Sequence, residues 1–111
     1  YEFVVVERAG RLAGYACYGP VPGSDDSYDL YCIAVRPEAQ RSGLGGRILA
    51  RAEAAMRAAG AGRLYVDTSM SPAYAATRAF YEKAGYEVAA TLPDFYRPGD
   101  GKVIFQKSFK P

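Results

Sequence analysis

Apolar and polar residues follow two different periods along the chain, and together they predict an α/β domain. Short apolar or β-branched runs bounded by Gly, Pro or Asp indicate strands over residues 2–7, 12–18, 28–35, 63–68, 86–92 and 102–109. Apolar residues at helical spacing predict a helix from about Gly43 to Ala59. Ser71, as N-cap, and Pro72 predict the start of a second helix, which runs to about Ala84 and stops at Gly85. The predicted order is β-β-β-α-β-α-β-β.

This order predicts a mixed sheet in one domain that spans residues 1–111. The first two strands are joined by a short turn and are expected to form an antiparallel hairpin. The strands on either side of the first helix are expected to be parallel, because a strand-helix-strand crossover is right-handed and returns in the same direction. Gly14, inside a strand, indicates a bulge or a close approach of another backbone. Residues 93–101 are rich in Pro, Gly and Asp and are predicted to form a loop.

Composition excludes several classes of function. The net charge is only +2, so we expect neither a nucleic-acid partner nor a membrane surface. No apolar run approaches the ~18–20 residues of a membrane span, and the first residues read as a strand instead of a signal peptide, which predicts a cytoplasmic protein. There is no histidine, and Cys17 and Cys32 lie in strand-like runs, so we expect reduced thiols and no metal site. Any acid or base must therefore be Asp, Glu, Tyr, Lys, Cys or water.

The stretch from residue 35 to residue 49 carries the clearest chemical signal. It passes from the end of an apolar strand, through Gln40 and closely spaced glycines, into the first helix. Glycine lets a ligand approach the backbone, and the free N–H groups of a helix N-terminus favour an anion such as phosphate. Arg41 and Arg47 add positive charge. The spacing matches neither the P-loop nor the dinucleotide fingerprint, and a tight loop without a ligand remains the simpler alternative.

The complete string, a strand followed by Val-x-Pro, Gln-x-x-Gly-x-Gly and an amphipathic helix, resembles the acyl-CoA pyrophosphate loop of the GNAT (Gcn5-related N-acetyltransferase) superfamily. The resemblance covers nearly all of the chain, from the family's second strand to its seventh; the family's usual N-terminal strand and helices are missing from it. It implies that acetyl-CoA is the co-substrate. The residues that it implies for cofactor binding are Ile33, Ala34 and Val35 through their backbone, then Gln40, Arg41, Ser42, Gly43, Leu44, Gly45, Gly46, Tyr74 and Tyr81.

The run from Phe80 to Tyr86 resembles the family's Phe-Tyr-Glu-Lys-x-Gly signature. The resemblance implies that Tyr81 is the general acid that protonates the thiolate of CoA; the alternative is a half-buried packing tyrosine. With Phe80 as the centre of the helix's core stripe, Tyr81 falls on an adjacent stripe. Seven residues before Tyr81, many members carry an Asn that contacts CoA, and Tyr74 occupies that position here.

Asp29 is the candidate general base. By the strand period of two it shares one face with Tyr31, Ile33 and Val35. It stands eleven residues before Gln40, where histone-type members of the family carry their acidic base. An attacking amine must be neutral, and a carboxylate can accept its proton directly or through water. A solvated aspartate at the strand end is the alternative, with water alone as the base.

The resulting hypothesis is an N-acetyltransferase that acts on a primary amine, either a small molecule or a peptide, in a ternary complex. Phe95 and Tyr96 shape the entrance of the acceptor pocket in this interpretation, or simply cap the core. A non-catalytic acyl-CoA-binding module is the main alternative, and a generic phosphate-binding domain is a weaker one. The sheet edge left open by the missing first strand suggests a homodimer. The sequence does not name the acceptor or the acyl chain length.

Overall fold

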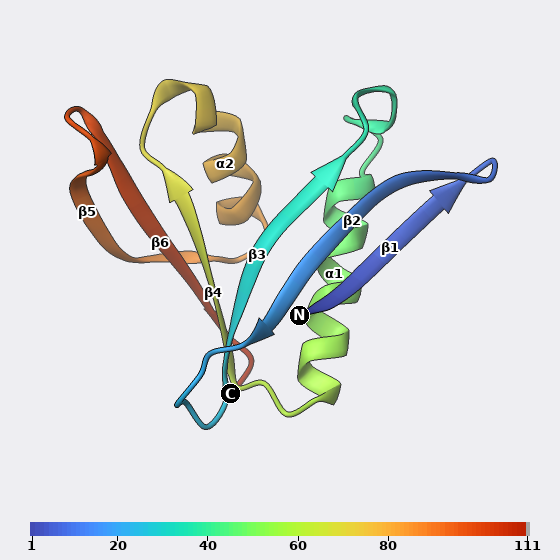
Figure 1. The fold of residues 1–111 in the computed structure, drawn as a ribbon, viewed down its shortest axis with the longest axis horizontal. Helices are drawn as coiled ribbons and strands as arrows, with labels where there is room; N and C mark the ends of the chain where they lie inside the picture. The colour runs from blue at the N-terminus through green and yellow to red at the C-terminus, as the bar shows by residue number, and fades with distance from the viewer. Residues whose placement is uncertain (111) are drawn as a thin grey trace. The chain divides into compact units, whose positions relative to one another are not determined.

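The computed structural model describes residues 1–110 and contains the expected elements in the expected order, β-β-β-α-β-α-β-β (Figure 1). Contacts between Cα atoms divide the chain into two compact units, Tyr1–Gly62 and the segment from Arg63 onward. Two short 3-10 helices, η1 (Pro37–Ala39) and η2 (Pro72–Tyr74), add to the expected elements. The parallel pairing expected across the first helix would join the two units and stays a prediction.

The first unit is built on three antiparallel strands, β1 (Glu2–Arg8), β2 (Arg11–Pro20) and β3 (Ser27–Val35), with β2 in the middle. The register between β2 and β3 shifts by one residue, because Cys17 pairs with Cys32 and Tyr18 with Leu30, so that Tyr31 is the extra residue of a bulge. The predicted face shared by Asp29, Tyr31, Ile33 and Val35 is therefore wrong, since the bulge interrupts the strict alternation on which it depended.

Helix α1 (Leu44–Ala58) packs on this sheet and contacts all three strands. Its buried side chains are those of the predicted apolar stripe: Leu44, Ile48, Leu49, Ala52 and Met56. Gly14 on β2 allows the close approach that its position predicted, because a Cβ there would lie 2.7 Å from Ile48 Cδ1 and 2.8 Å from the carbonyl oxygen of Ala34. The apolar face of α1 thus fixes the point at which the helix begins.

The second unit is built on β4 (Arg63–Ser69), β5 (Glu87–Arg97) and β6 (Asp100–Ser108), with β6 paired antiparallel to both neighbours. The predicted loop over residues 93–101 is wrong: β5 extends to Arg97, and only Pro98 and Gly99 separate it from β6. Register shifts between Leu92 and Arg97 and a positive φ of 60° at Asp94 accommodate Pro93 within the strand. Proline interrupted the pattern of the ladder but did not end the strand.

Helix α2 (Ala75–Lys83) ends as predicted, with Gly85 at φ +95° just beyond it. The expected cap at its start is wrong in detail: Ser71 precedes η2 but makes no side-chain cap, because its N–H and hydroxyl are engaged by the hydroxyl of Ser69. The core stripe is also rotated from the prediction, since Tyr81 is the buried residue of α2, whereas Phe80 is half-buried and Ala76 is exposed.

The structure also bears on the predictions about membrane spans and about the two cysteines. No helix within residues 1–110 is long and apolar enough to cross a membrane. Cys17 and Cys32 are free thiols, Cys17 buried and Cys32 half-buried. They face each other as Cα partners on β2 and β3.

Candidate functional site

The loop that leads into α1 contains two residues in the left-handed region. It runs from the end of β3, through η1, to the N-cap residue Gly43, which has φ +80°. Arg41 also has a positive φ of 64°, unusual for a residue with a side chain. Left-handed residues in a turn can help to direct backbone N–H groups toward an anion. Strain of this kind at an exposed loop points to a functional role.

Three hydrogen bonds from side chains to the main chain hold this loop in place. Gln40 Nε2 donates to the carbonyl of Val35 at 3.1 Å, and Ser42 Oγ donates to the carbonyl of Ala39 at 2.5 Å. Arg36 Nε donates to the carbonyl of Leu12 on β2. Gln40 and Ser42 therefore stabilise the shape of the loop.

The helix N-terminus itself is open. Arg41, Ser42, Gly43 and Gly46 are exposed, and a Cβ at either of these glycines would meet nothing within 4 Å. The first helical bond runs from the N–H of Arg47 to the carbonyl of Gly43, and no side chain caps the preceding N–H groups. Leu44 is buried and can offer only its backbone N–H. Of the predicted phosphate-binding residues, the structure thus brings the segment Gln40–Gly46 together as one turn.

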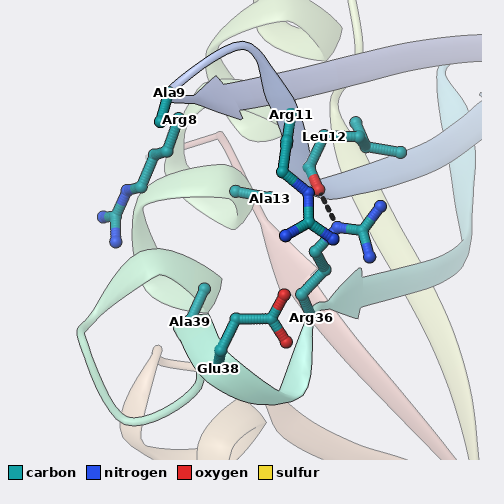
Figure 2. Close-up of a pocket in the computed structure, with 8 residues that line it drawn as sticks. All are labelled: Arg8, Ala9, Arg11, Leu12, Ala13, Arg36, Glu38 and Ala39. Atoms are coloured by element: carbon teal, nitrogen blue, oxygen red, sulfur yellow. Dashed lines mark hydrogen bonds between the residues drawn. The ribbon is translucent and has the colours of Figure 1, made fainter.

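A small cavity of about 230 Å³ lies beside this loop, between the β1–β2 turn and η1 (Figure 2). Its apolar floor includes Leu12, Ala13 and Ala39. Figure 2 shows Arg11, Arg36 and Glu38 grouped on one side of the cavity, with Arg8 directed away from them. All four charged residues are exposed. They add positive charge near the first residues of the loop.

The predicted base and the backbone ligands lie on β3. Asp29 is half-buried opposite Gly19 of β2, and the residues from Ile33 to Val35 are half-buried near the strand end. Partial burial and then the negative charge of Asp29 raise the pKa of Tyr31 above its ordinary value of 10.0. Asp29 and Tyr31 therefore interact electrostatically on β3.

Tyr81, the predicted acid, lies among aromatic rings of the second unit. Its side chain is 5% exposed. The ring centroids of Phe80 and Tyr86 lie 5.2 and 5.5 Å away in edge-to-face geometry, and that of Phe105 on β6 lies at 6.0 Å. Such contacts stabilise the ring and fix its position.

Tyr74, which occupies the position of the family's Asn, is half-exposed at the end of η2. It lines a second cavity, of about 300 Å³, which belongs wholly to the second unit. Tyr96 also lines this cavity, whereas Phe95 lies beneath the ammonium of Lys102, 4.3 Å from its ring centroid. A role for either ring at an acceptor pocket stays a prediction. The other residues that line the cavity are Asp67, Thr68, Ser69, Arg97 and Asp100.

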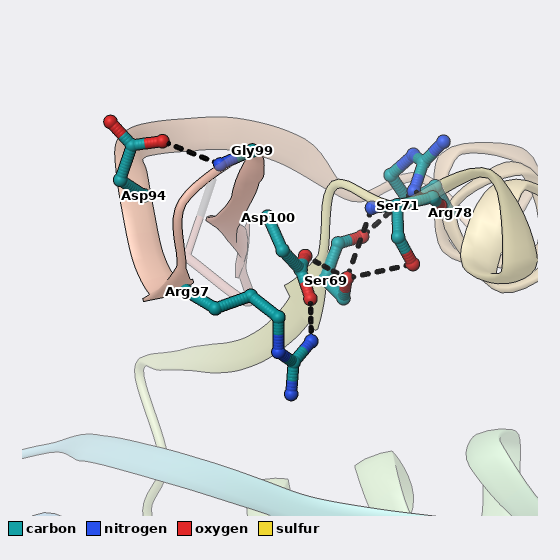
Figure 3. A network of polar contacts seen from close by, with 7 residues as sticks. All are labelled: Ser69, Ser71, Arg78, Asp94, Arg97, Gly99 and Asp100. Atoms are coloured by element: carbon teal, nitrogen blue, oxygen red, sulfur yellow. Dashed lines mark hydrogen bonds and ion pairs between the residues drawn. The ribbon is translucent and has the colours of Figure 1, made fainter.

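A polar network centred on the buried side chains of Ser69 and Asp100 forms one wall of this second cavity (Figure 3). Asp100 Oδ1 lies 2.5 Å from Ser69 Oγ, and Asp100 Oδ2 lies 2.6 Å from Arg97 Nη1. Arg78 on α2 donates to the carbonyls of Ser69 and Ser71 at 2.7 and 2.9 Å. The network connects β4, α2, β5 and β6, so it fixes the wall of the cavity. Within residues 1–110, no group of His, Cys, Asp and Glu side chains is arranged to hold a metal ion.

Sequence reasoning missed this network. Its members stand at positions 69, 78, 97 and 100, and no spacing rule relates them. The one available signal was the position of Asp100, which follows a Pro-Gly turn at the start of an apolar strand. A carboxylate that is buried at such a position needs polar partners. The partners themselves become apparent only once β4 and β6 are paired.

Comparison with known proteins agrees with this architecture. The model of the acetyltransferase (GNAT) family matches residues 1–86. A GNAT-family protein from Desulfovibrio desulfuricans is 46% identical, with a TM-score of 0.93 over 96% of this chain and 68% of that one. The ribosomal-protein-S18-alanine N-acetyltransferase of Escherichia coli is 25% identical, with a TM-score of 0.86 over all of this chain and 70% of that one.

A curated relative, the amino-acid acetyltransferase of Ectopseudomonas mendocina (strain ymp), is 31% identical over 107 residues. The match covers 96% of this chain, and the chain spans about a quarter (24%) of the length of that relative. The family match and the Desulfovibrio structure each cover most of the chain at a level that establishes kinship. The chain therefore belongs to the acetyltransferase (GNAT) family.

Proposed function

We propose that this chain is an N-acetyltransferase that transfers an acetyl group from acetyl-CoA to a primary amine by direct attack in a ternary complex. The single observation that carries the proposal is the open turn from Gln40 to Gly46, whose left-handed residues and uncapped helix N-terminus fit a pyrophosphate. Membership of the acetyltransferase family supports it independently.

The first unit holds the cofactor in this proposal. The N–H groups from Arg41 to Gly46 bind the pyrophosphate of acetyl-CoA, while Gln40 and Ser42 keep the turn in shape. The residues from Ile33 to Val35 supply backbone groups to the pantetheine arm, and one of their N–H groups polarises the thioester carbonyl. Because the turn uses backbone groups, its affinity depends little on which side chains surround it.

The chemical step uses the thioester as an activated acyl group. The ammonium form of the acceptor loses a proton to Asp29 or to water, and the neutral nitrogen attacks the thioester carbonyl carbon. The nitrogen of the tetrahedral intermediate then releases its second proton to solvent. A C–N bond forms, the C–S bond breaks, and the electron pair leaves with sulfur. Tyr81 donates its phenolic proton to that sulfur and is reprotonated from solvent. No covalent enzyme intermediate is required, and neither Cys17 nor Cys32 has a neighbouring base that would activate it.

The acceptor is a small-molecule or peptide amine. The enzyme works in the cytoplasm, because two cysteines without a disulfide are usual in a reducing compartment. We also propose a single functional domain over residues 1–111 that acts as a homodimer. The amino-acid and ribosomal-protein acetyltransferases among its relatives both acylate amines, which is consistent with this assignment.

Release of CoA thiol tests the proposal directly. The protein is mixed with acetyl-CoA and a panel of primary amines, and free thiol is measured with a disulfide reagent. We expect amine-dependent thiol release that Tyr81→Phe lowers strongly without weakening CoA binding. Equal release with and without every amine would contradict the assignment.

A non-catalytic acyl-CoA-binding module is the second candidate, and two observations favour it. Tyr81 is buried among aromatic rings, as a packing residue would be, and Tyr74 replaces the family's Asn. Binding of acetyl-CoA without thiol release on the whole panel would select this candidate.

A further inference from the structure

We propose that Cys17 and Cys32 are a redox-sensitive pair, which a small-molecule disulfide such as oxidised glutathione closes into a reversible bridge between β2 and β3. The bridge follows from the geometry of the first unit alone. The weaker binding of acetyl-CoA that we expect from the bridged protein rests, in addition, on the proposed function.

The register of β2 and β3 places the two thiols within reach of each other. Cys17 and Cys32 are Cα partners, and direct partners in an antiparallel pair project their side chains on the same face of the sheet. The N–H of Arg36 donates to the carbonyl of Ala13, which continues the same register as a hydrogen-bonded pair. Counted in steps of two, Cys17 and Cys32 are also a hydrogen-bonded pair, whose Cα atoms lie ~5.5 Å apart. A disulfide spans about 4.4–6.8 Å between Cα atoms, so the pair can be bridged.

The bulge beside the pair allows the bridge to close and to reopen. The Cβ atoms of cross-strand partners lie ~4.5–5.5 Å apart, whereas a disulfide brings them to about 3.8 Å. Closure therefore draws Cys32 toward β2. The extra residue, Tyr31, lies next to Cys32 and already interrupts the ladder, so the strand can shift there. A bridge closed in this way is strained, and strained disulfides are reduced more readily than relaxed ones.

The two cysteines differ in exposure, which sets the order of the exchange. Cys32 is half-buried, whereas Cys17 is buried at 9% exposure. The thiolate of Cys32 attacks one sulfur of oxidised glutathione, forms a mixed disulfide and releases the first glutathione thiolate. The burial of Cys17 does not prevent the second step, because its thiolate attacks the neighbouring Cys32 sulfur and releases the second glutathione.

The exchange balances without any further reactant. Two S–H bonds of the protein are lost and one S–S bond is gained, so the cysteine pair gives up two electrons and two protons. The glutathione disulfide takes up both electrons as its S–S bond breaks, and the two protons end on the two glutathione thiols. An excess of reduced glutathione or dithiothreitol reverses the exchange.

The position of the pair connects the bridge to the segment proposed to bind acetyl-CoA. Cys32 is followed directly by Ile33, the first of the three residues whose backbone is assigned to the pantetheine arm. Asp29, the proposed base, lies on the same strand beyond the bulge. A movement of Cys32 toward β2 therefore displaces the backbone of Ile33. Because displacements of ~1 Å disrupt the positioning of a bound substrate, we expect the bridged form to bind acetyl-CoA about tenfold more weakly.

Mass spectrometry of the complete chain tests the bridge. The protein is incubated with oxidised glutathione at mildly alkaline pH, treated with an alkylating reagent and measured without reduction. We expect a monomer that is lighter by two hydrogen atoms, carries no alkyl group and yields a cross-linked peptide that joins Cys17 to Cys32. Dithiothreitol should restore two alkylated thiols. Two thiols that stay free, a stable mixed disulfide or a disulfide-linked dimer would overturn the proposal.

Two variants test the order of the exchange. Cys17→Ala retains the half-buried thiol but cannot resolve the mixed disulfide, so the adduct of Cys32 with glutathione should accumulate. Cys32→Ala retains only the buried thiol and should form its adduct at least about tenfold more slowly while folded. Urea midpoints of both variants verify that they are folded. Adducts that form equally fast in the two variants would contradict the assigned order.

Titration with acetyl-CoA separates the bridge from the proposed function. The oxidised protein should bind more weakly than the reduced protein, dithiothreitol should restore the affinity, and Cys17→Ala kept reduced should bind as the reduced wild type does. Equal affinity of the oxidised and reduced protein would overturn the effect on β3. Absence of binding by the reduced protein would overturn the proposed function and the effect that rests on it, whereas the cross-link between Cys17 and Cys32 would still support the bridge.

Discussion

The Gln40–Gly46 turn of the first unit and the polar cavity of the second are built in opposite ways. The turn is a continuous stretch of seven residues, Gln40–Gly46, that presents backbone N–H groups. The cavity uses side chains from four separate elements, with the buried Asp100 at 9% exposure between Ser69 and Arg97. A backbone site tolerates changes of side chain but not of conformation, whereas a side-chain site has the opposite sensitivity.

The largest effect is expected from a side chain, Tyr81. Tyr81→Phe keeps the ring contacts with Tyr86 and Phe105 and removes only the hydroxyl, so the fold should persist. Loss of a general acid lowers turnover by about 10²–10⁴-fold. Steady-state thiol release measures turnover, and titration with CoA measures affinity, which should not change. Unchanged turnover would remove Tyr81 from the chemistry and leave it as a packing residue.

The backbone turn is broken most cleanly at Gly43. Gly43→Ala places a Cβ at φ +80°, which costs roughly 1–2 kcal/mol. Gly23 provides a matched control, since it lies in the same unit at φ +82° and also has open space around it. Both variants should lose similar stability to urea, but only Gly43→Ala should weaken acetyl-CoA binding, by about tenfold. Equal losses of affinity would show that the turn is not the binding site.

The side-chain network is tested at Asp100 against Asp94. Asp100→Asn removes the charge that bonds both Ser69 and Arg97, and should lower the free energy of unfolding by about 1–2 kcal/mol. Asp94 is exposed, and an Asn there can still accept the hydrogen bond from the N–H of Gly99. Asp94→Asn should therefore change stability by less than about 0.5 kcal/mol. Identical urea midpoints for the two variants would mean that the network does not stabilise the cavity wall.

The smallest effect is a pH dependence confined to the first unit. Burial, and then the charges of Glu2 and Tyr28, raise the pKa of Tyr18 above 10.0. As the pH rises past 10, the unfolded chain loses this proton first, so stability is complete below that pH and falls as the pH approaches the pKa of the folded state. Urea midpoints between about pH 9 and pH 11 should decline, and Tyr18→Phe should flatten the decline. A decline that is as steep in the variant would assign it to other groups.

Most of the fold could be predicted because its signals are local. The period of α1, the glycine after α2 and the β-branched strands each lie within one segment of sequence. The errors arose where tertiary pairing prevailed over local pattern. The bulge at Tyr31 changed which side chains of β3 share a face, and β5 continued through Pro93 because β6 pairs with it on both sides of the register shift.

The two candidate sites differ in the same way, because one is formed by local sequence and the other by tertiary pairing. The turn at Gln40–Gly46 could be proposed from sequence because its residues are contiguous and glycine-rich, and the structure confirms that a helix begins within it, at Leu44. The roles of Arg97 and Ser69 could not be predicted from sequence, because each side chain bonds Asp100, which lies far from Ser69 in the sequence. Burial of Tyr81 was also missed, because the stripe of α2 was centred one residue away.

A thermal-shift titration with acetyl-CoA, with ATP as the control, tests the central claim most directly. A ligand that binds only the folded chain stabilises it by RT ln(1 + [L]/Kd), about 2.7 kcal/mol at a hundredfold excess over Kd. The account predicts a rise in Tm with acetyl-CoA, little or none with ATP, and a reduced rise for Gly43→Ala compared with Gly23→Ala. Equal shifts with both ligands, or no shift with acetyl-CoA, would contradict it.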